Sequence, residues 1–383
     1  MSVPGPLNGV TVVDMTRVLA GPFSTMLLAE LGARVIKVET PGQGDDARHY
    51  GPFVNGKSAY FVSINRGKES IALDLKAEAD RTVFEGLLAC ADVLVENFRP
   101  GTMEKLGYGW DELHPKYPKL IYAAVSGFGH SGPHSRRPAY DMVVQAMGGI
   151  MSITGQPGAP PTRVGTSIGD IGAGLFTAVG INAALFDRAR TGEARKIDIG
   201  MLDCQVSLCE NALVRYTATG EIPGPLGARH PSITPFQVFS TKDGHMIIAA
   251  GNDVMYQRLC QALERPDLAE DPRYQTNDLR NQNHAALEPE VDAELSKRTT
   301  AEWLALLDEL GIPASGINNM ADVMAHPQMG PRNMVVEVPD ATTGTLKVAG
   351  NPIKISGYAD PPSREAAPDL DRDRDRILKE LGL

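Results

Sequence analysis

Short apolar runs alternate with amphipathic stretches along the N-terminal part of the chain. The apolar runs are GVTVVD, RVIKVE, SIALDL, ADVLVEN and LIYAAVS, and the stretches between them include PFSTMLLAELG. Runs rich in β-branched residues predict strands, and their alternation with helical stretches predicts a largely parallel sheet covered by helices. Pro22 near the start of the first helical stretch and Gly32 just past its end support that helix. We therefore expect an α/β fold.

A helix of small and apolar residues is predicted from Asp170 to Thr191, and Gly192 follows it. The strand ARKIDIG and a further helix come next along the chain. The longest apolar run of the helix predicted from Asp170 to Thr191, residues 172–186, is shorter than the ~20 residues that span a bilayer. We therefore expect a buried helix and no membrane partner.

A proline- and glycine-rich segment, residues 219–235, predicts a linker between two domains. Residues 1–218 form the first part of the large α/β domain. Residues 236–328 begin with FQVFSTKDGHMIIAAG, which predicts a hairpin around a Lys-Asp-Gly turn, and continue with helical patterns, so we expect a smaller α+β domain. Residues 329–383 are strand-rich, end in a short charged surface helix and return to the large domain.

Composition and charge exclude several classes of function. The length of 383 residues favours two domains, and 42% hydrophobic with 22% charged residues is typical of folded proteins. The net charge is −10 without a basic stripe, which argues against nucleic acid as a partner. The four cysteines show no CxxC spacing and predict reduced, buried thiols. The start of the chain, MSVPGPLNG, does not resemble a secretory signal, so we expect a cytoplasmic protein.

Three common catalytic or cofactor motifs are incomplete. The turn MTRVLAGP lacks GxGxxG, so Glu39 is better interpreted as a surface acid at a strand end than as a ribose ligand. AVSGFG around Ser126 lacks the first glycine of a hydrolase elbow. His130 and His134 are separated by a Gly-Pro pair that would break a zinc-binding helix. We expect no metal.

The segment RVGTSIGDIGAGLFTAVG holds closely spaced glycines around Asp170, and these would let the backbone crowd around a ligand. Asp170 stands at the start of the predicted helix, and an ordinary N-cap is the favoured interpretation of this segment alone. The helix dipole would keep its carboxylate ionised. A second cluster, PAYDMVVQAMGG, contains Tyr140 and Asp141, and Asp141 could equally be an N-cap.

The ordered blocks DMTRVLAGP, VIKVETPG, LDLK, ADVLVENFRPG, LIYAAVSGFG and GTSIGD resemble the family III CoA-transferases of the CaiB/BaiF type from end to end. The resemblance implies a large Rossmann-like parallel-sheet domain and a smaller α+β domain. It further implies a homodimer of ring-like, interlocked subunits. CoA would enter and leave as an acyl-CoA substrate and product.

The resemblance also implies roles for particular residues. Asp170 would be the nucleophile, which overrides the N-cap interpretation, with Tyr140, Asp141 and Gly169 in support. The loop from Pro138 to Asp141 would line the thioester. CoA would lie against Arg17, Val18, Leu19, Leu73, Asp74, Leu75, Lys76, Asn97, Phe98, Arg99 and Lys105.

Departures from particular family members bear on the substrate. Leu19 and Pro138 replace a glutamine and a lysine of formyl-CoA transferase, and PGPLGARHPS replaces its glycine-rich lid, which argues against oxalate or formate. Tyr140 replaces the histidine base of the racemases, and a phenol of pKa ~10 is a poor base for proton exchange at carbon. AGNDVMYQRLCQALERPDL and YQTNDLRNQN are similar to dicarboxylate CoA-transferases that use succinyl-CoA. Arg163 or Arg229 would hold the distal carboxylate.

The expected reaction proceeds through a mixed anhydride on Asp170 and then an aspartyl-CoA thioester, with backbone amides stabilising the oxyanions. Two alternatives stay open at this point. One is a racemase-like enzyme that acts on 2-methylacyl-CoA, and the other is a non-catalytic protein that binds acyl-CoA.

Overall fold

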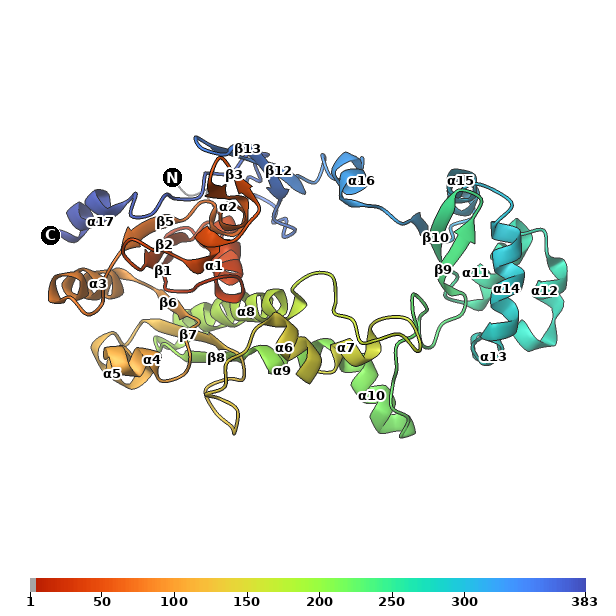
Figure 1. Cartoon of the computed structure of the whole chain (residues 1–383), viewed down its shortest axis with the longest axis horizontal. Helices are drawn as coiled ribbons and strands as arrows, with labels where there is room; N and C mark the ends of the chain where they lie inside the picture. Colours follow the sequence, from red (N-terminus) through yellow and green to blue (C-terminus); the bar gives the residue numbers. More distant parts are fainter. Residues whose placement is uncertain (1–4) are drawn as a thin grey trace. The chain divides into compact units, whose positions relative to one another are not determined.

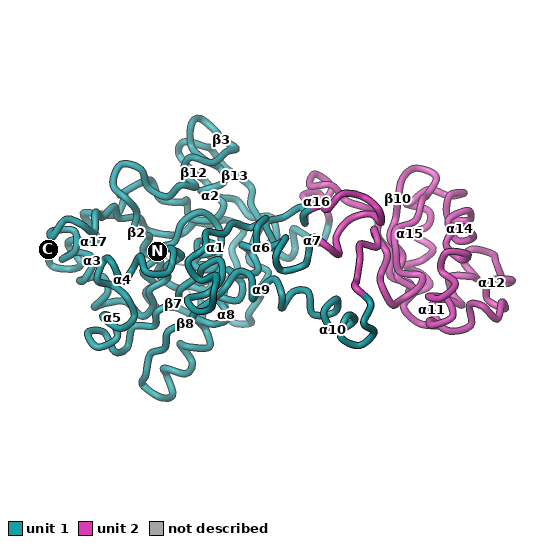
Figure 2. The backbone as a smooth tube through the Cα atoms, turned by 60° about the horizontal axis from the view of Figure 1, so that its bottom comes forward, with its two compact units in different colours: residues 1–151, 163–221, 327–383 teal, residues 152–162, 222–326 magenta. Residues whose placement is uncertain are grey.

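The computed structural model describes residues 5–383, which group into two compact units. The large unit comprises residues 1–151, 163–221 and 327–383, and the small unit comprises residues 152–162 and 222–326 (Figure 2). Residues 152–162 thus group with the small unit, and the chain returns to the large unit at residue 327.

A six-stranded sheet, parallel throughout, forms the centre of the large unit (Figure 1). Its spatial order is β5-β2-β1-β6-β7-β8, the strand order of Rossmann folds, which confirms the predicted fold class. The strands are β1 (Thr11–Asp14), β2 (Arg34–Glu39), β5 (Glu69–Ala72), β6 (Val93–Glu96), β7 (Ile121–Ser126) and β8 (Lys196–Gly200).

Helices cover both faces of this sheet because successive strand residues are apolar on alternate sides. Val13 packs with α3 and α17 on one face, whereas Val12 packs with α1 and α8 on the other. The helices of this unit are α1 (Ala20–Glu30), η1 (Asp46–His49), α2 (Ala59–Asn65), α3 (Glu78–Cys90), α4 (Thr102–Leu106), α5 (Trp110–Lys116), α6 (Asp141–Met147), α8 (Ile168–Thr191), α9 (Met201–Leu208), α10 (Glu210–Thr219) and α17 (Arg374–Leu381), and α7 (Ile150–Ile153) begins in this unit and ends in the small one. Two small hairpins join β3 (Phe53–Val54) to β4 (Lys57–Ser58) and β12 (Val335–Asp340) to β13 (Gly344–Ala349).

The helix α8 differs from its prediction in two ways. It begins at Ile168 rather than Asp170. Its 24 residues are also long and apolar enough, by length and composition alone, to cross a membrane. Core helices of soluble proteins pass the same test. It is not buried on all sides, since Val179 and Phe186 are each 66% exposed in the single chain.

The glycines of α8 serve close helix packing. A Cβ at Gly174 would lie 2.7 Å from the carbonyl oxygen of Ala20 in α1, and one at Gly169 would lie 2.7 Å from Cγ2 of Val144 in α6. Both distances are too short for a real Cβ. These glycines therefore let α8 pack directly against α1 and α6. The sequence had instead suggested that they make room for a ligand.

The small unit is built on the predicted hairpin, β9 (Phe236–Thr241) paired with β10 (Gly244–Ala249), to which β11 (Ala314–Gly316) adds a third strand. A core that includes Trp303 and Tyr256 joins this sheet to its helices. These are α11 (Asp253–Ala262), α12 (Pro266–Glu270), η2 (Pro272–Tyr274), α13 (Asn277–Gln282), α14 (His284–Leu295), α15 (Thr300–Glu309) and α16 (Met320–Ala325).

All four cysteines are free thiols. Cys204 and Cys260 are buried and Cys209 is half-buried, in line with the prediction, but Cys90 at the end of α3 is exposed.

Candidate active site

A cavity of about 270 Å³ lies in the large unit, next to the carboxyl ends of β1 and β6. These strands are neighbours, but α1 follows β1 on one face of the sheet while α4 and α5 follow β6 on the other. Open α/β sheets bind ligands at such a switch point. The predicted site residues that line the cavity are Arg17, Val18, Leu19, Asn97, Phe98, Arg99, Pro138, Tyr140 and Asp170.

The other residues expected at CoA do not line this cavity. Leu73 and Leu75 are 4% and 9% exposed, and their side chains pack into the core. Only their backbone groups could therefore contact CoA. Asp74 accepts the backbone N–H of Lys76 at 3.0 Å, and Lys105 is exposed on α4.

The two arginines expected to hold a distal carboxylate lie elsewhere. Arg163 is exposed and donates to the carbonyl of its neighbour Val164 at 3.3 Å. Arg229 belongs to the small unit, where it donates to Oδ1 of Asn281 at 3.2 Å and lines a separate cavity together with His284.

Asp170 is the third residue of α8, so it is not the N-cap that the sequence favoured. The N-cap is Ser167, whose side chain makes no capping hydrogen bond. Asp170 is half-buried in the first turn and lines the cavity. Its carboxylate is therefore available for chemistry and has no capping role.

Asp141 supports the start of α8 from the neighbouring helix α6. It is the first residue of α6, not its N-cap, and its Oδ1 accepts the N–H of Gly169 at 2.8 Å. Its Oδ2 accepts the side-chain amide of Gln145 at 2.8 Å, and Gln145 Oε1 in turn accepts the N–H of Val164 at 3.0 Å. The predicted supporting residues Asp141 and Gly169 thus bond each other directly beside Asp170.

The carboxyl of Asp170 does not keep the low pKa expected at a helix start. Burial, together with the negative charge of Asp141, raises the pKa of Asp170 to about 7. Both effects disfavour the ionised form, and they outweigh the helix dipole. Burial and the Asp170 charge also raise the pKa of the Tyr60 phenol to about 12, which places Tyr60 in the surroundings of this carboxyl although its sequence context gave no sign of it.

Three arginines line the cavity, and the sequence reasoning missed one of them. Arg17 lies over the ring of Phe98, with its guanidinium carbon 5.1 Å from the ring centroid. Arg137, which was missed, contacts His134 and the ring of Phe128, neither of which is an acid. Guanidinium groups bind phosphate and carboxylate groups well, because they can donate two parallel hydrogen bonds. Ala139 lines the cavity as part of the predicted loop from Pro138 to Asp141. The other lining residues that were not predicted are Ala20, Asp46, Pro100, Val125, Ser126, Gly127 and Met201.

Glu39, His130 and His134, which belong to the incomplete motifs, have structural partners. Glu39 is 5% exposed and pairs with Arg48 at 2.6 Å, so it is a buried ion-pair residue and the surface interpretation was wrong. His134 packs against Phe128, and Nδ1 of His130 lies 3.3 Å from Nζ of Lys196. Over residues 5–383, no group of three His, Cys, Asp or Glu side chains could hold a metal ion.

Comparison with known proteins agrees with this arrangement. The family model described as CoA-transferase family III matches residues 7–374. The acetyl-CoA:oxalate CoA-transferase of Acetobacter aceti is 46% identical over 98% of this chain and 96% of its own length. The succinyl-CoA:glutarate CoA-transferase of Mus musculus is 40% identical over 98% of this chain and 86% of its own.

A solved structure gives the same result. The crystal structure of a CaiB/BaiF family protein from Brucella suis superposes with a TM-score of 0.86 at 39% identity, covering 98% of this chain and 99% of that one. The chain therefore belongs to CoA-transferase family III.

Proposed function

We propose that this protein transfers CoA from an acyl-CoA thioester to a free dicarboxylic acid, with the Asp170 carboxylate as nucleophile. The observation that carries the proposal is a half-buried carboxyl of raised pKa in a cavity that also holds three arginines. A buried carboxylate is a stronger nucleophile than a solvated one, and the arginines suit the anionic groups of both substrates.

The reaction has two symmetrical halves. An ionised oxygen of Asp170 attacks the thioester carbonyl, and the C–S bond breaks to give a mixed anhydride and CoA thiolate. The thiolate attacks the aspartyl carbonyl, which forms an enzyme thioester and releases the first acid as its carboxylate. The acceptor acid reverses both steps, so no proton is consumed overall and no metal is required.

The curated relatives narrow the substrates that we propose. Their names give acetyl-CoA with oxalate and succinyl-CoA with glutarate or mesaconate. We therefore include oxalate among the proposed acceptors, although the residues Leu19 and Pro138 had led us to expect otherwise. We propose succinyl-CoA or acetyl-CoA as donor and a dicarboxylate as acceptor.

A panel assay tests this function. Purified protein is incubated with succinyl-CoA or acetyl-CoA and separately with oxalate, glutarate, mesaconate or citramalate, and new acyl-CoA esters are detected by mass spectrometry. Formation of at least one dicarboxyl-CoA supports the proposal. Incorporation of solvent deuterium at carbon-2 of a branched acyl-CoA without acid exchange would support a racemase, and binding without either reaction would support a non-catalytic protein.

Arg137 is our candidate for the group that holds the distal carboxylate, because it lines the cavity with Asp170 and has no acidic partner within residues 5–383. Arg137→Ala should raise the KM for the dicarboxylate acceptor roughly tenfold, the cost of one charge-assisted pair. Arg137→Lys should recover only part of the loss, since lysine cannot form the bidentate fork.

Arg136→Ala is the matched control, since Arg136 is equally exposed and does not line the cavity. A monocarboxylate acceptor should respond to neither change. If Arg137→Ala instead raised the KM for the acyl-CoA donor, Arg137 would bind CoA and the distal carboxylate would need another partner.

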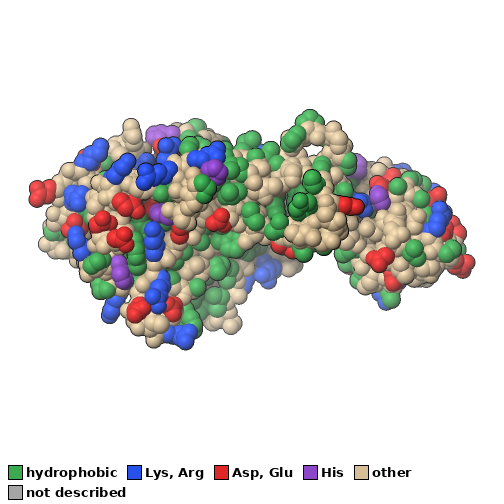
Figure 3. All heavy atoms as spheres, turned by 90° about the horizontal axis from the view of Figure 1, so that it is seen from below, with side chains coloured by type: hydrophobic (Ala, Val, Ile, Leu, Met, Phe, Trp, Pro, Cys, Tyr) green, Lys and Arg blue, Asp and Glu red, His purple; other side chains and the backbone are tan. Residues whose placement is uncertain are grey.

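We also propose a homodimer, with the interlocked subunits that the resemblance implies. One line of support is the apolar surface of α6, α8 and α10, where Met142, Val179, Phe186, Leu213 and Val214 are each more than half exposed. Figure 3 shows apolar side chains exposed among charged ones on the face seen from below. Large exposed apolar side chains in such number are typical of interaction sites.

Charge placed on this surface should prevent dimer formation. Val179→Asp together with Phe186→Asp should give a monomer in sedimentation velocity where the wild-type protein is a dimer, because a buried, unpaired carboxylate strongly opposes association. Leu383→Asp, at the similarly exposed chain end, serves as the control and should leave the mass unchanged. A wild-type monomer at micromolar concentration would contradict the proposal.

A further inference from the structure

The loop that connects β1 to α1, residues 16–19, lines the cavity and is held by side chains from other segments. Asn97 holds Arg17 through both backbone groups: the N–H of Arg17 donates to the amide oxygen and its C=O accepts from the amide nitrogen, each at 2.8 Å. The next residue, Val18, has a φ of 67°, a left-handed conformation that β-branched residues rarely adopt. Such conformations persist only where the surroundings fix them, and they cluster at functional sites.

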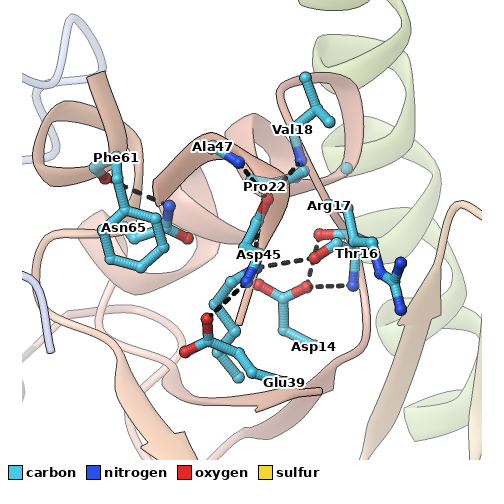
Figure 4. A network of polar contacts seen from close by, with 12 residues as sticks. Asp14, Thr16, Arg17, Val18, Pro22, Glu39, Asp45, Ala47, Phe61 and Asn65 are labelled. Carbon is cyan, nitrogen blue, oxygen red and sulfur yellow. Dashed lines mark hydrogen bonds and ion pairs between the residues drawn. The ribbon is translucent and has the colours of Figure 1, made fainter. Parts of the chain in front are cut away.

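Asp45 and Lys37 fix the loop on either side of Arg17. Figure 4 shows the carboxylate of Asp45 directed toward Val18. Oδ1 of Asp45 accepts the N–H of Val18 at 3.0 Å, and its Oδ2 lies 2.8 Å from Nζ of Lys37. The same Nζ donates to the C=O of Thr16 at 2.7 Å. The two side chains are only 1% and 0% exposed, so one buried ion pair holds two residues of a cavity-lining loop.

The pair is part of a larger buried network. Asp14 accepts the N–H of Thr16 at 2.9 Å and lies 3.0 Å from Nζ of Lys68, while Glu39 accepts the N–H of Asp45 at 2.9 Å. Desolvation offsets much of the attraction within a buried ion pair, and apolar side chains of similar volume often stabilise a fold equally well. Apolar side chains, however, could not bond the N–H and C=O groups of the loop.

We propose that Asp45 and Lys37 are positioning residues that pre-form the loop of residues 16–19 for the acyl-CoA substrate. The inference rests on the proposed function, because it takes acyl-CoA as the ligand of this loop. A loop that already has its bound conformation loses less entropy when the ligand binds, and affinity rises accordingly. Neither side chain lines the cavity, so the effect reaches the substrate through Thr16 and Val18.

Two variants of Asp45 test this role, because a positioning residue should affect the KM for acyl-CoA much more than kcat. Asp45→Ala should raise the KM for acyl-CoA roughly tenfold while kcat changes by less than about threefold, and the KM for the free acid should stay unchanged. Asp45→Asn keeps an acceptor for the N–H of Val18 but removes the anion from Lys37, so its effect should be smaller.

A second change should rescue the first. Adding Val18→Gly to Asp45→Ala should recover part of the acyl-CoA KM, because glycine adopts a positive φ without steric cost. Melting temperatures are measured for each variant, because glycine at a positive φ also relieves strain in the folded state. A KM that only followed the melting temperature would mean a merely destabilised fold and would count against the inference.

Asp340→Asn is the matched control. Asp340 is 3% exposed in its own ion pair with Lys57 at 2.6 Å, in the same unit but outside the cavity lining. It should lower the melting temperature without changing either KM.

An unchanged acyl-CoA KM in folded Asp45→Ala, or in Asp45→Asn if the alanine variant does not fold, would overturn the inference. The proposed function fails separately, if the wild-type protein exchanges CoA with no acid of the panel. In that case, acyl-CoA affinity measured by titration calorimetry still decides whether Asp45 positions the loop.

Discussion

Replacement of Asp170 with alanine should lower the rate of CoA transfer by roughly 10³-fold or more, since the covalent route requires its carboxylate. Asp170→Asn should be nearly as inactive, because an amide is a poor nucleophile although it fills the same space. Both variants should still bind acyl-CoA, because the loops after β1 and β6 remain in place. The measurements are initial rates by mass spectrometry and acyl-CoA affinity by calorimetry.

Asp187→Ala is the control for this experiment. Asp187 lies on the same helix, but its carboxylate is partly exposed and pairs with Arg195 at 3.1 Å. It should retain wild-type turnover. Hydroxylamine or borohydride added during turnover should modify the peptide that contains Asp170, and near-normal turnover of Asp170→Ala would show that another group is the nucleophile.

The second large effect is on the pH dependence of transfer. Because burial and the charge of Asp141 raise the pKa of Asp170 to about 7, the carboxyl is protonated below that pH and cannot attack. The value of kcat/KM for acyl-CoA should therefore rise about tenfold per pH unit below 7 and level off above it. Rates measured from pH 5 to 9 check this expectation.

Asp141→Asn should move the midpoint of this profile to lower pH, since it removes the neighbouring negative charge that raises the pKa of Asp170. Burial is the larger cause and remains, so the midpoint should stay above the ordinary carboxyl range. Some rate loss should accompany the shift, because the amide of Gln145 loses its acceptor. A midpoint near 4 in the wild-type protein would contradict the assignment.

Local pattern was enough to predict the sheet and the hairpin of the small unit. Strands such as GVTVVD and RVIKVE are buried on both faces, and continuous apolar β-branched runs are the direct result of that burial. The hairpin β9–β10 follows from two such runs and a short turn. Asp170 was found through the ordered motifs of a known family and not through its own segment, which favoured an N-cap.

Features that depend on tertiary contacts could not be predicted from the sequence. The start of α8 depends on Asp141, which accepts the N–H of Gly169 from a different helix, 28 residues earlier in the chain. The raised pKa of Asp170 depends on the same neighbour and on burial. Arg137 stands in an exposed loop whose sequence does not reveal that it lines the cavity.

The close approach of α8 to α1 limits how the enzyme can adapt to different acids. Gly174 brings α8 against the main chain of Ala20, the first residue of α1, just after the loop of residues 16–19. The spacing between the backbone of α8, which carries Asp170, and that loop is therefore set by main-chain contact, and a side-chain rotamer change cannot widen the distance between the two backbones. Acids of different length have to be accommodated at the rim of the cavity. New acceptor preferences should thus be reachable through rim substitutions, with the bond-forming geometry left intact.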